Sequence, residues 1–381
     1  MTENIAKKIF AFSLNHQRSI KIKNLMNYSE IIAVTTDFMK YEAVKRKKEA
    51  QKFYEKTVFI NLATCFLGYV VMIKIAAILP DNFAYFSIFD VIMFILSTSF
   101  LSISLYYLGT LLHDYIHAEQ YYSKRANFAM KYLLPIVFPL NASAYRWGHF
   151  SHHSNTNRYE EKLDTLPPFI NQKTLGAFWL NVIIHSFMLS LILIVRLMIK
   201  PFFMVSEKTQ LIYFNYISPI GLVSPQAYSL RKNYKEFSKI LIGDSITLGC
   251  FLIFWEMSKL SMMFIFMYLF TLVITASCIA FRTLVDHALI NVKGQEGAMK
   301  ANFYFTSNFS EKYFWYAGFA TYHLLHHINS SIPNYFCKEV NDILCQQFPE
   351  YHKLHEKRNN LRLIIRDFFS KNIQEADLLN I

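Results

Sequence analysis

Apolar and polar stretches alternate along this chain on the length scale of a lipid bilayer. The apolar stretches lie at residues 57–79, 87–112, 241–257 and 261–281. A helix needs about 20 apolar residues to cross about 30 Å of hydrocarbon; the third stretch is slightly short and the others are long enough. The links 80–86 and 258–260 are too short for anything but a turn between antiparallel neighbours. The pattern therefore predicts an all-α integral membrane protein with four transmembrane helices in two hairpins.

Composition and charge agree with this pattern. The chain of 381 residues is 53% hydrophobic and 17% aromatic, with a mean hydropathy of +0.21, which is too apolar for an ordinary soluble domain. A net charge of +12 could indicate nucleic-acid binding, but the lysines flank the apolar stretches, where anionic lipid head groups are the nearer partner. We therefore expect no nucleic-acid partner. The basic run at residues 45–48 precedes the first span, so the positive-inside rule predicts a cytoplasmic segment 1–56.

Histidine is concentrated in three short runs. Eight of the 13 histidines lie in them: His113 and His117, then His149, His152 and His153, then His323, His326 and His327. Residues three or four apart share one face of a helix, so each run places its imidazoles on one face. Neutral imidazole is the commonest protein metal ligand. The runs therefore predict a metal site held by a helical cap, and we expect no catalytic side chain beyond its ligands.

A single metal site constrains the topology, because its ligands must meet on one side of the membrane. Between the second and third runs the chain must therefore cross an even number of times. Three apolar stretches lie there, since residues 175–199 form a further one. Arg196 and Lys200 favour the head-group region, so we expect 175–199 to be interfacial or re-entrant, with 241–257 as the alternative. Residues 128–140, which contain two prolines, are too short to span and should lie against the interface.

These motifs resemble the membrane fatty acid desaturases, a family that also includes hydroxylases and carotenoid ketolases. The resemblance rests on HDYIH, on HFSHH within WGHFSHHSNTN, and on YHLLHH followed by IPNY, in this order. It covers about residues 55–360. We accordingly divide the chain into the segment 1–56, a desaturase-like membrane domain at 57–360 and a polar tail at 361–381.

The resemblance implies one more ligand. His287, at the end of the last apolar stretch, lies where related proteins carry a lone ligating histidine; the alternative is a histidine that only ends a helix. Ligating histidines usually donate their second ring N–H to a carboxylate or carbonyl. Asp114, Asp164 and Asp286 lie close to the motifs and are candidates for this supporting role, although each could be an ordinary solvated charge.

Nine histidines fit two irons. Two ions of five or six coordination, each with a position open to O2, use about eight to ten protein ligands, whereas zinc needs fewer and calcium prefers oxygen donors. The resemblance implies a di-iron enzyme on the cytoplasmic side that uses O2 to desaturate a fatty-acyl or acyl-lipid chain in the bilayer. Its electrons would come from an external ferredoxin- or cytochrome-type protein with its reductase.

Two alternatives remain open from the sequence. The same iron chemistry could hydroxylate or oxidise a lipid or carotenoid, and the product would distinguish these reactions. A non-enzymatic membrane metal or haem protein is the alternative of another class. It would carry its histidines at membrane depth, whereas those of the three runs follow the ends of the apolar stretches.

Overall fold

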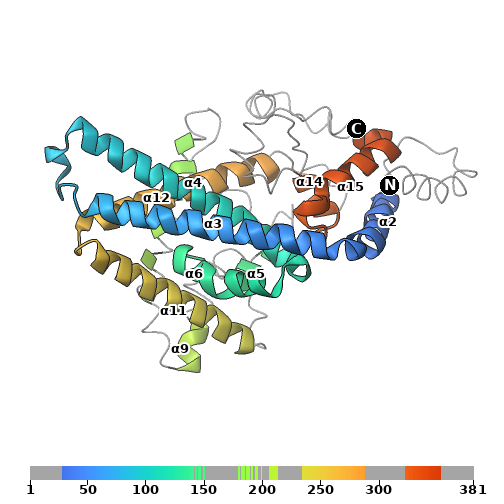
Figure 1. Ribbon diagram of the computed structural model, residues 1–381, viewed down its shortest axis with the longest axis horizontal. Helices are drawn as coiled ribbons and strands as arrows, with labels where there is room; N and C mark the ends of the chain where they lie inside the picture. Colours follow the sequence, from blue (N-terminus) through green and yellow to red (C-terminus); the bar gives the residue numbers. More distant parts are fainter. Residues whose placement is uncertain are drawn as a thin grey trace, which may run out of the picture.

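A computed structural model describes residues 28–140, 206–212, 234–287 and 322–352, with single residues and short pieces between 142 and 199. Every regular element in these ranges is helical, which confirms the predicted all-α class for the described part of the chain. The long helices lie alongside one another, and the elements after the third histidine run lie at one end of them (Figure 1). The shorter elements are α2 (Tyr28–Phe38), η2 (Met39–Ala43), η3 (Phe83–Tyr85), η4 (Glu119–Tyr121), α5 (Lys124–Phe128), η5 (Ala129–Leu133), α6 (Leu134–Val137), α9 (Glu207–Ile212), α14 (His323–Ile328) and α15 (Asn334–Gln347).

The first predicted hairpin is formed by α3 (Lys47–Ala76) and α4 (Ile88–Ala118). Helix α3 begins ten residues before the apolar stretch. Its backbone hydrogen bonds do not depend on side-chain polarity, so the helix includes the polar residues that precede this stretch. Ser87 and Asp90 form a capping box that begins α4. The two helices approach closely at Gly68, where an added Cβ would lie 2.9 Å from Cδ1 of Leu101.

The second hairpin is formed by α11 (Tyr234–Met257) and α12 (Met262–His287). Its turn contacts the turn of the first hairpin, since Ser261 Oγ donates a hydrogen bond to Asp81 Oδ1 at 3.1 Å. Both turns lie at the left of Figure 1, and α14, with the third histidine run, lies towards the right. Inside the bundle, the Ser102 hydroxyl donates to the Thr271 carbonyl at 3.1 Å, which ties α4 to α12. Interhelical hydrogen bonds from small residues are typical of membrane bundles.

Within the described ranges, three helical segments are long and apolar enough to cross a membrane: Lys47–Ala76, Ile88–Tyr121 and Met262–Arg282. They overlap most of the predicted spans 57–79, 87–112 and 261–281. The fourth, residues 241–257, lies within α11, a continuous helix of 24 residues, and its crossing stays a prediction. Of residues 175–199 only some are described, all of them helical, and Trp179 stacks on Phe281 with ring centroids 5.1 Å apart. Whether that stretch is interfacial also stays a prediction.

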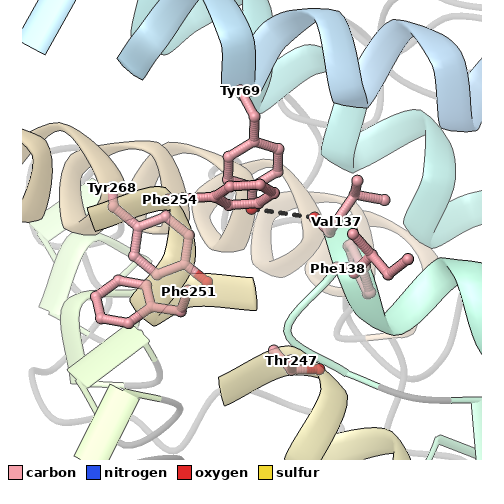
Figure 2. A pocket seen from close by; sticks show the side chains of 8 residues that line it. Tyr69, Val137, Phe138, Thr247, Phe251, Phe254 and Tyr268 are labelled. Atoms are coloured by element: carbon pink, nitrogen blue, oxygen red, sulfur yellow. Dashed lines mark hydrogen bonds between the residues drawn. The ribbon is translucent and has the colours of Figure 1, made fainter. Parts of the chain in front are cut away.

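The proline-containing segment is divided into the short helices α5, η5 and α6, which pack beside α3 and α11. The Tyr69 hydroxyl of α3 donates to the Val137 carbonyl at 3.1 Å, as Figure 2 shows. A hollow of about 10 Å³ lies beside this bond, between α6 and residues of α11 and α12 such as Phe251 and Tyr268. This is room for no more than about one water molecule, so the hollow does not accommodate an acyl chain.

Candidate metal centre

The first histidine run lies in the last turns of α4. His113 and His117 are four residues apart in this helix, so they face the same side, as the spacing predicts. Their rings lie 5.5 Å apart between centroids, and the Nε2 atom of each is buried. Residues 104–118 of α4 are all buried or half-buried, whereas the helix before them exposes large apolar side chains as far as Ile103. The first histidine run therefore lies beyond the exposed apolar surface of α4.

The other two runs each place a histidine against this pair. His149, in a helical piece of the second run, lies 4.5 Å from His113 and 4.9 Å from His117 between ring centroids. His326, in α14, lies 4.5 Å from His113 and 4.4 Å from His117. The ligand-capable nitrogens of these four residues all lie within 4.8 Å of one another. Residues more than 200 positions apart in the chain thus form one cluster, as the three runs predict.

The cluster fits a transition-metal ion. Metal–imidazole bonds are about 2.0–2.1 Å long, so two nitrogens on one ion can be at most about 4.2 Å apart. The observed limit of 4.8 Å therefore requires only small ring movements. The four donors are all imidazoles, which suits iron, copper or zinc and does not suit magnesium or calcium. The described residues therefore fit the predicted metal cofactor.

The remaining predicted ligands are placed only in part. His327 is half-buried in α14, with its ring centroid 5.6 Å from that of His326, and it is not one of the four clustered residues. His323 begins α14 and His287 ends α12, but their side chains lie outside what the structure describes. His152 and His153 lie outside the described residues altogether. The same is true of Asp164 and of the Asp286 side chain.

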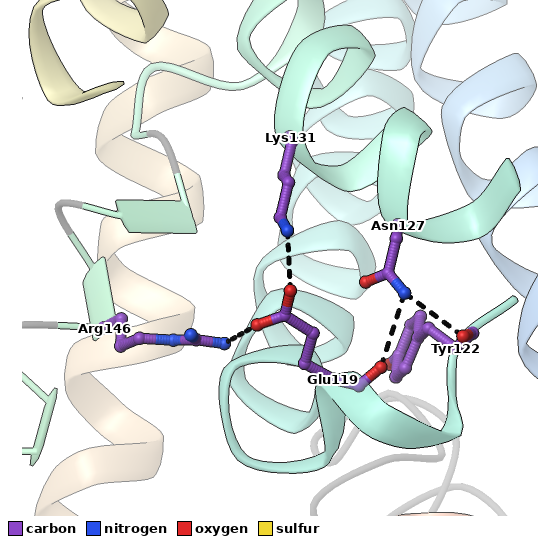
Figure 3. A network of polar contacts seen from close by, with 5 residues as sticks. All are labelled: Glu119, Tyr122, Asn127, Lys131 and Arg146. Carbon is purple, nitrogen blue, oxygen red and sulfur yellow. Dashed lines mark hydrogen bonds and ion pairs between the residues drawn. The ribbon is translucent and has the colours of Figure 1, made fainter. Parts of the chain in front are cut away.

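An ionic network connects the first run to the second (Figure 3). Glu119, two residues after His117, accepts from Lys131 Nζ at 2.6 Å and from Arg146 Nη2 at 2.5 Å. Arg146 precedes His149 by three residues, and its guanidinium lies 5.9 Å from the ring centroid of Phe150. The network therefore fixes the start of the second run beside the end of α4.

Asp114 connects the first run to the helix that follows the third. Its carboxylate accepts from the backbone N–H of Asn334 at 2.8 Å and from the Tyr122 hydroxyl at 3.1 Å, and the Tyr54 hydroxyl is a further partner. Burial and the neighbouring Asp114 carboxylate raise the pKa of Tyr122 well above its usual value, so this hydroxyl stays protonated and can donate. Among the described contacts, the partners of Asp114 are these groups rather than an imidazole.

Sequence reasoning missed Glu119, Arg146, Tyr54 and Tyr122. The first two could have been found as opposite charges directly flanking two histidine runs. Tyr122 lies only five residues after His117, but nothing in the sequence distinguishes it from the other 23 tyrosines. Tyr54 is about 60 residues from the nearest run, so only the packing of α3 against α4 reveals it.

Comparison with known proteins adds one finding. The family model described as "Fatty acid desaturase" matches residues 90–358, which include all three histidine runs and His287. No curated protein and no solved structure matches the chain. The matched region covers more than two thirds of the sequence, and it contains the histidine cluster, most of the candidate span Ile88–Tyr121 and all of Met262–Arg282. This chain therefore belongs to the fatty acid desaturase family of membrane oxidoreductases.

Proposed function

We propose that the protein is an O2-dependent, di-iron desaturase that introduces a double bond into a fatty-acyl or acyl-lipid chain. The observation that carries this proposal is the meeting of imidazoles from all three histidine runs beyond the exposed apolar surface of α4. At this position the site can be reached by a substrate that is dissolved in the hydrocarbon layer of the bilayer.

The residues have distinct roles in this proposal. His113, His117, His149 and His326 would hold metal, and the five remaining predicted histidines would complete the set for two irons. When bound, the irons would supply the means to reduce O2. The balance is that two hydrogens leave adjacent carbons of the chain and O2 takes them up together with two electrons and two protons, giving a double bond and two waters. The electrons would come from an external ferredoxin- or cytochrome-type protein with its reductase.

The proposed depth of the site follows from helix geometry. His113 lies 25 residues after the start of α4, which corresponds to about 37 Å at 1.5 Å per residue. This exceeds the roughly 30 Å of the hydrocarbon layer. If α4 begins near one boundary, the histidine cluster therefore lies just beyond the other. The large apolar side chains exposed on α4, from Ile88 to Ile103, fit contact with lipid.

The topology that we propose has four spans, with the histidine cluster on the cytoplasmic side. The contact between Ser261 and Asp81 supports it, because it holds both hairpin turns at one end of the bundle. Cysteine substitutions at Asp81 and Asn329, in a variant without other cysteines, should react with an impermeant reagent from opposite sides of the membrane. Labelling of both positions from the same side would contradict the four-span arrangement.

Expression in a host that lacks desaturases tests the reaction itself. We expect new unsaturated acyl chains in the lipid profile, and none with His326→Ala. His352→Ala is the matched control, because His352 is exposed and lies outside the four-histidine cluster. A product with added oxygen and no double bond would favour the hydroxylase alternative. No product at all, with iron bound and an electron donor supplied, would overturn the proposal.

A further inference from the structure

Helix α15 begins without a cap from its own sequence. Its N-cap position is Pro333, which provides no side-chain hydrogen bond. The first N–H groups of a helix have no partner within the helix, and leaving them buried without an acceptor is costly. Here the first two of these groups are satisfied from two other helices: the Asn334 N–H donates to Asp114 Oδ1 at 2.8 Å, and the Tyr335 N–H donates to the Tyr54 hydroxyl at 3.1 Å. The cap of α15 is therefore supplied by α4 and α3.

The residues that supply this cap are held rigidly. Tyr54 and Tyr122 stack with ring centroids 4.2 Å apart, and Tyr115 packs edge-on against Tyr122 at 4.9 Å. All three tyrosines are less than 2% exposed. The Tyr122 hydroxyl donates a hydrogen bond to the buried Asp114 carboxylate at 3.1 Å, and the Tyr54 hydroxyl is a further partner of this carboxylate.

The path from this cap back to the metal cluster is short. Asp114 directly follows His113, and Asn334 lies eight residues after His326. The connection between α14 and α15 is a tight turn, in which the Ile332 N–H donates to the Asn329 carbonyl at 3.1 Å. Ile328 and Ile332 are buried on either side of this turn. A shift of the α15 start would therefore move α14, and with it His326 relative to His113.

We infer that Asp114 and Tyr54 are positioning residues that cap α15 in trans, with Tyr122 holding Asp114 in place, and that they thereby keep His326 against the first histidine pair. This inference rests on the proposed function only in taking the cluster as a metal site. It also gives Asp114 a role in placing a histidine through the backbone of the next helix, whereas ligating histidines more commonly rely on a direct carboxylate partner.

The test compares two buried Tyr→Phe changes in the full-length protein. Tyr54→Phe removes the acceptor of the Tyr335 N–H and one partner of Asp114. Tyr351→Phe is the matched control: Tyr351 is also fully buried beside α15, and its hydroxyl donates one hydrogen bond, to Asn341 Oδ1 at 2.9 Å, but this lies away from the start of the helix. Both variants should lose similar thermal stability, because each loses buried hydrogen bonding.

Metal binding should separate them. With Co2+ as the probe, measured by competition with a chelator, we expect Tyr54→Phe to bind about 10–100-fold more weakly than the wild type, with an altered visible absorption spectrum. Tyr351→Phe should change the Co2+ affinity less than about twofold, because it leaves the hydrogen bonds at the start of α15 in place. Amide hydrogen exchange should also become faster at residues 334–336 in Tyr54→Phe and stay unchanged there in the control.

Equal Co2+ affinities in the two variants, or wild-type affinity in Tyr54→Phe, would overturn the inference. If Tyr54→Phe does not fold, Tyr122→Phe takes its place against the same control, because it removes one donor to Asp114 and leaves the Tyr335 N–H bonded. Its loss of affinity should be smaller but still exceed that of the control. Failure of the desaturase proposal would be seen separately, as a wild-type protein that binds Co2+ normally but yields no unsaturated product.

Discussion

The pairing of Arg146 with Glu119 predicts that a change outside the histidine runs will weaken metal binding. We consider Arg146→Met, which keeps an apolar stem and removes the charge. The side chains of Arg146 and Glu119 are 34% and 29% exposed, so their pairing contributes about 1 kcal/mol, at the upper end for accessible pairs. The guanidinium over Phe150, at 5.9 Å, adds about 0.5 kcal/mol. Together these contacts stabilise the position of the second run by about 1.5 kcal/mol.

This energy can be converted into an expected affinity. Because 1.4 kcal/mol corresponds to a factor of ten, releasing the second run should weaken metal binding through His149 by about tenfold. The assay is Co2+ competition with a chelator at fixed pH, together with thermal unfolding. Only a small loss of global stability is expected, since Glu119 keeps its contact with Lys131.

The matched control is Arg125→Met. Arg125 lies 3.6 Å from Glu55 and its side chain is 83% exposed, so this pair contributes almost nothing. Both substitutions remove one positive charge, so a general electrostatic effect on cation binding would appear equally in both. If Arg146→Met and Arg125→Met bind Co2+ equally well, the reasoning that the network positions the second run is refuted.

Two further predictions concern the ends and the interior of the bundle. His287→Ala should abolish turnover and lower iron content as fully as His326→Ala if His287 is a ligand; wild-type activity and iron content would remove it from the ligand set. Gly68→Ala should destabilise the protein by about 1–3 kcal/mol, because the new methyl group would lie 2.9 Å from buried Leu101. Gly249→Ala has nothing within 4 Å and should stabilise α11 by up to about 1 kcal/mol. Thermal unfolding in detergent distinguishes the two, and equal effects would contradict the close packing of α3 on α4.

The sequence by itself determined the class of the protein and the core of its site. Apolar stretches of membrane length predict helices, because an isolated span must satisfy its backbone hydrogen bonds internally. The spacing within each histidine run predicts a shared face, because helical periodicity is local. His113 and His117 in α4 follow from such local rules, and the order of the runs was sufficient to indicate the family. The hairpin turns were equally predictable, since short links leave few alternatives.

The tertiary structure decided how these local elements are held together. Tyr54 and Tyr335 are 281 residues apart, Asp114 and Asn334 are 220 apart, and no periodic pattern reports contacts of that range. The sequence marks Asp114 only as a carboxylate near a histidine run, for which an imidazole partner is the natural expectation. The structure gives it the start of α15 instead, because Pro333 leaves that helix without a side-chain cap and the packing of the helices places the Asn334 amide beside this carboxylate. Which donors meet which acceptors in a buried site depends on the packing of whole helices, and that packing arises only when the chain has folded.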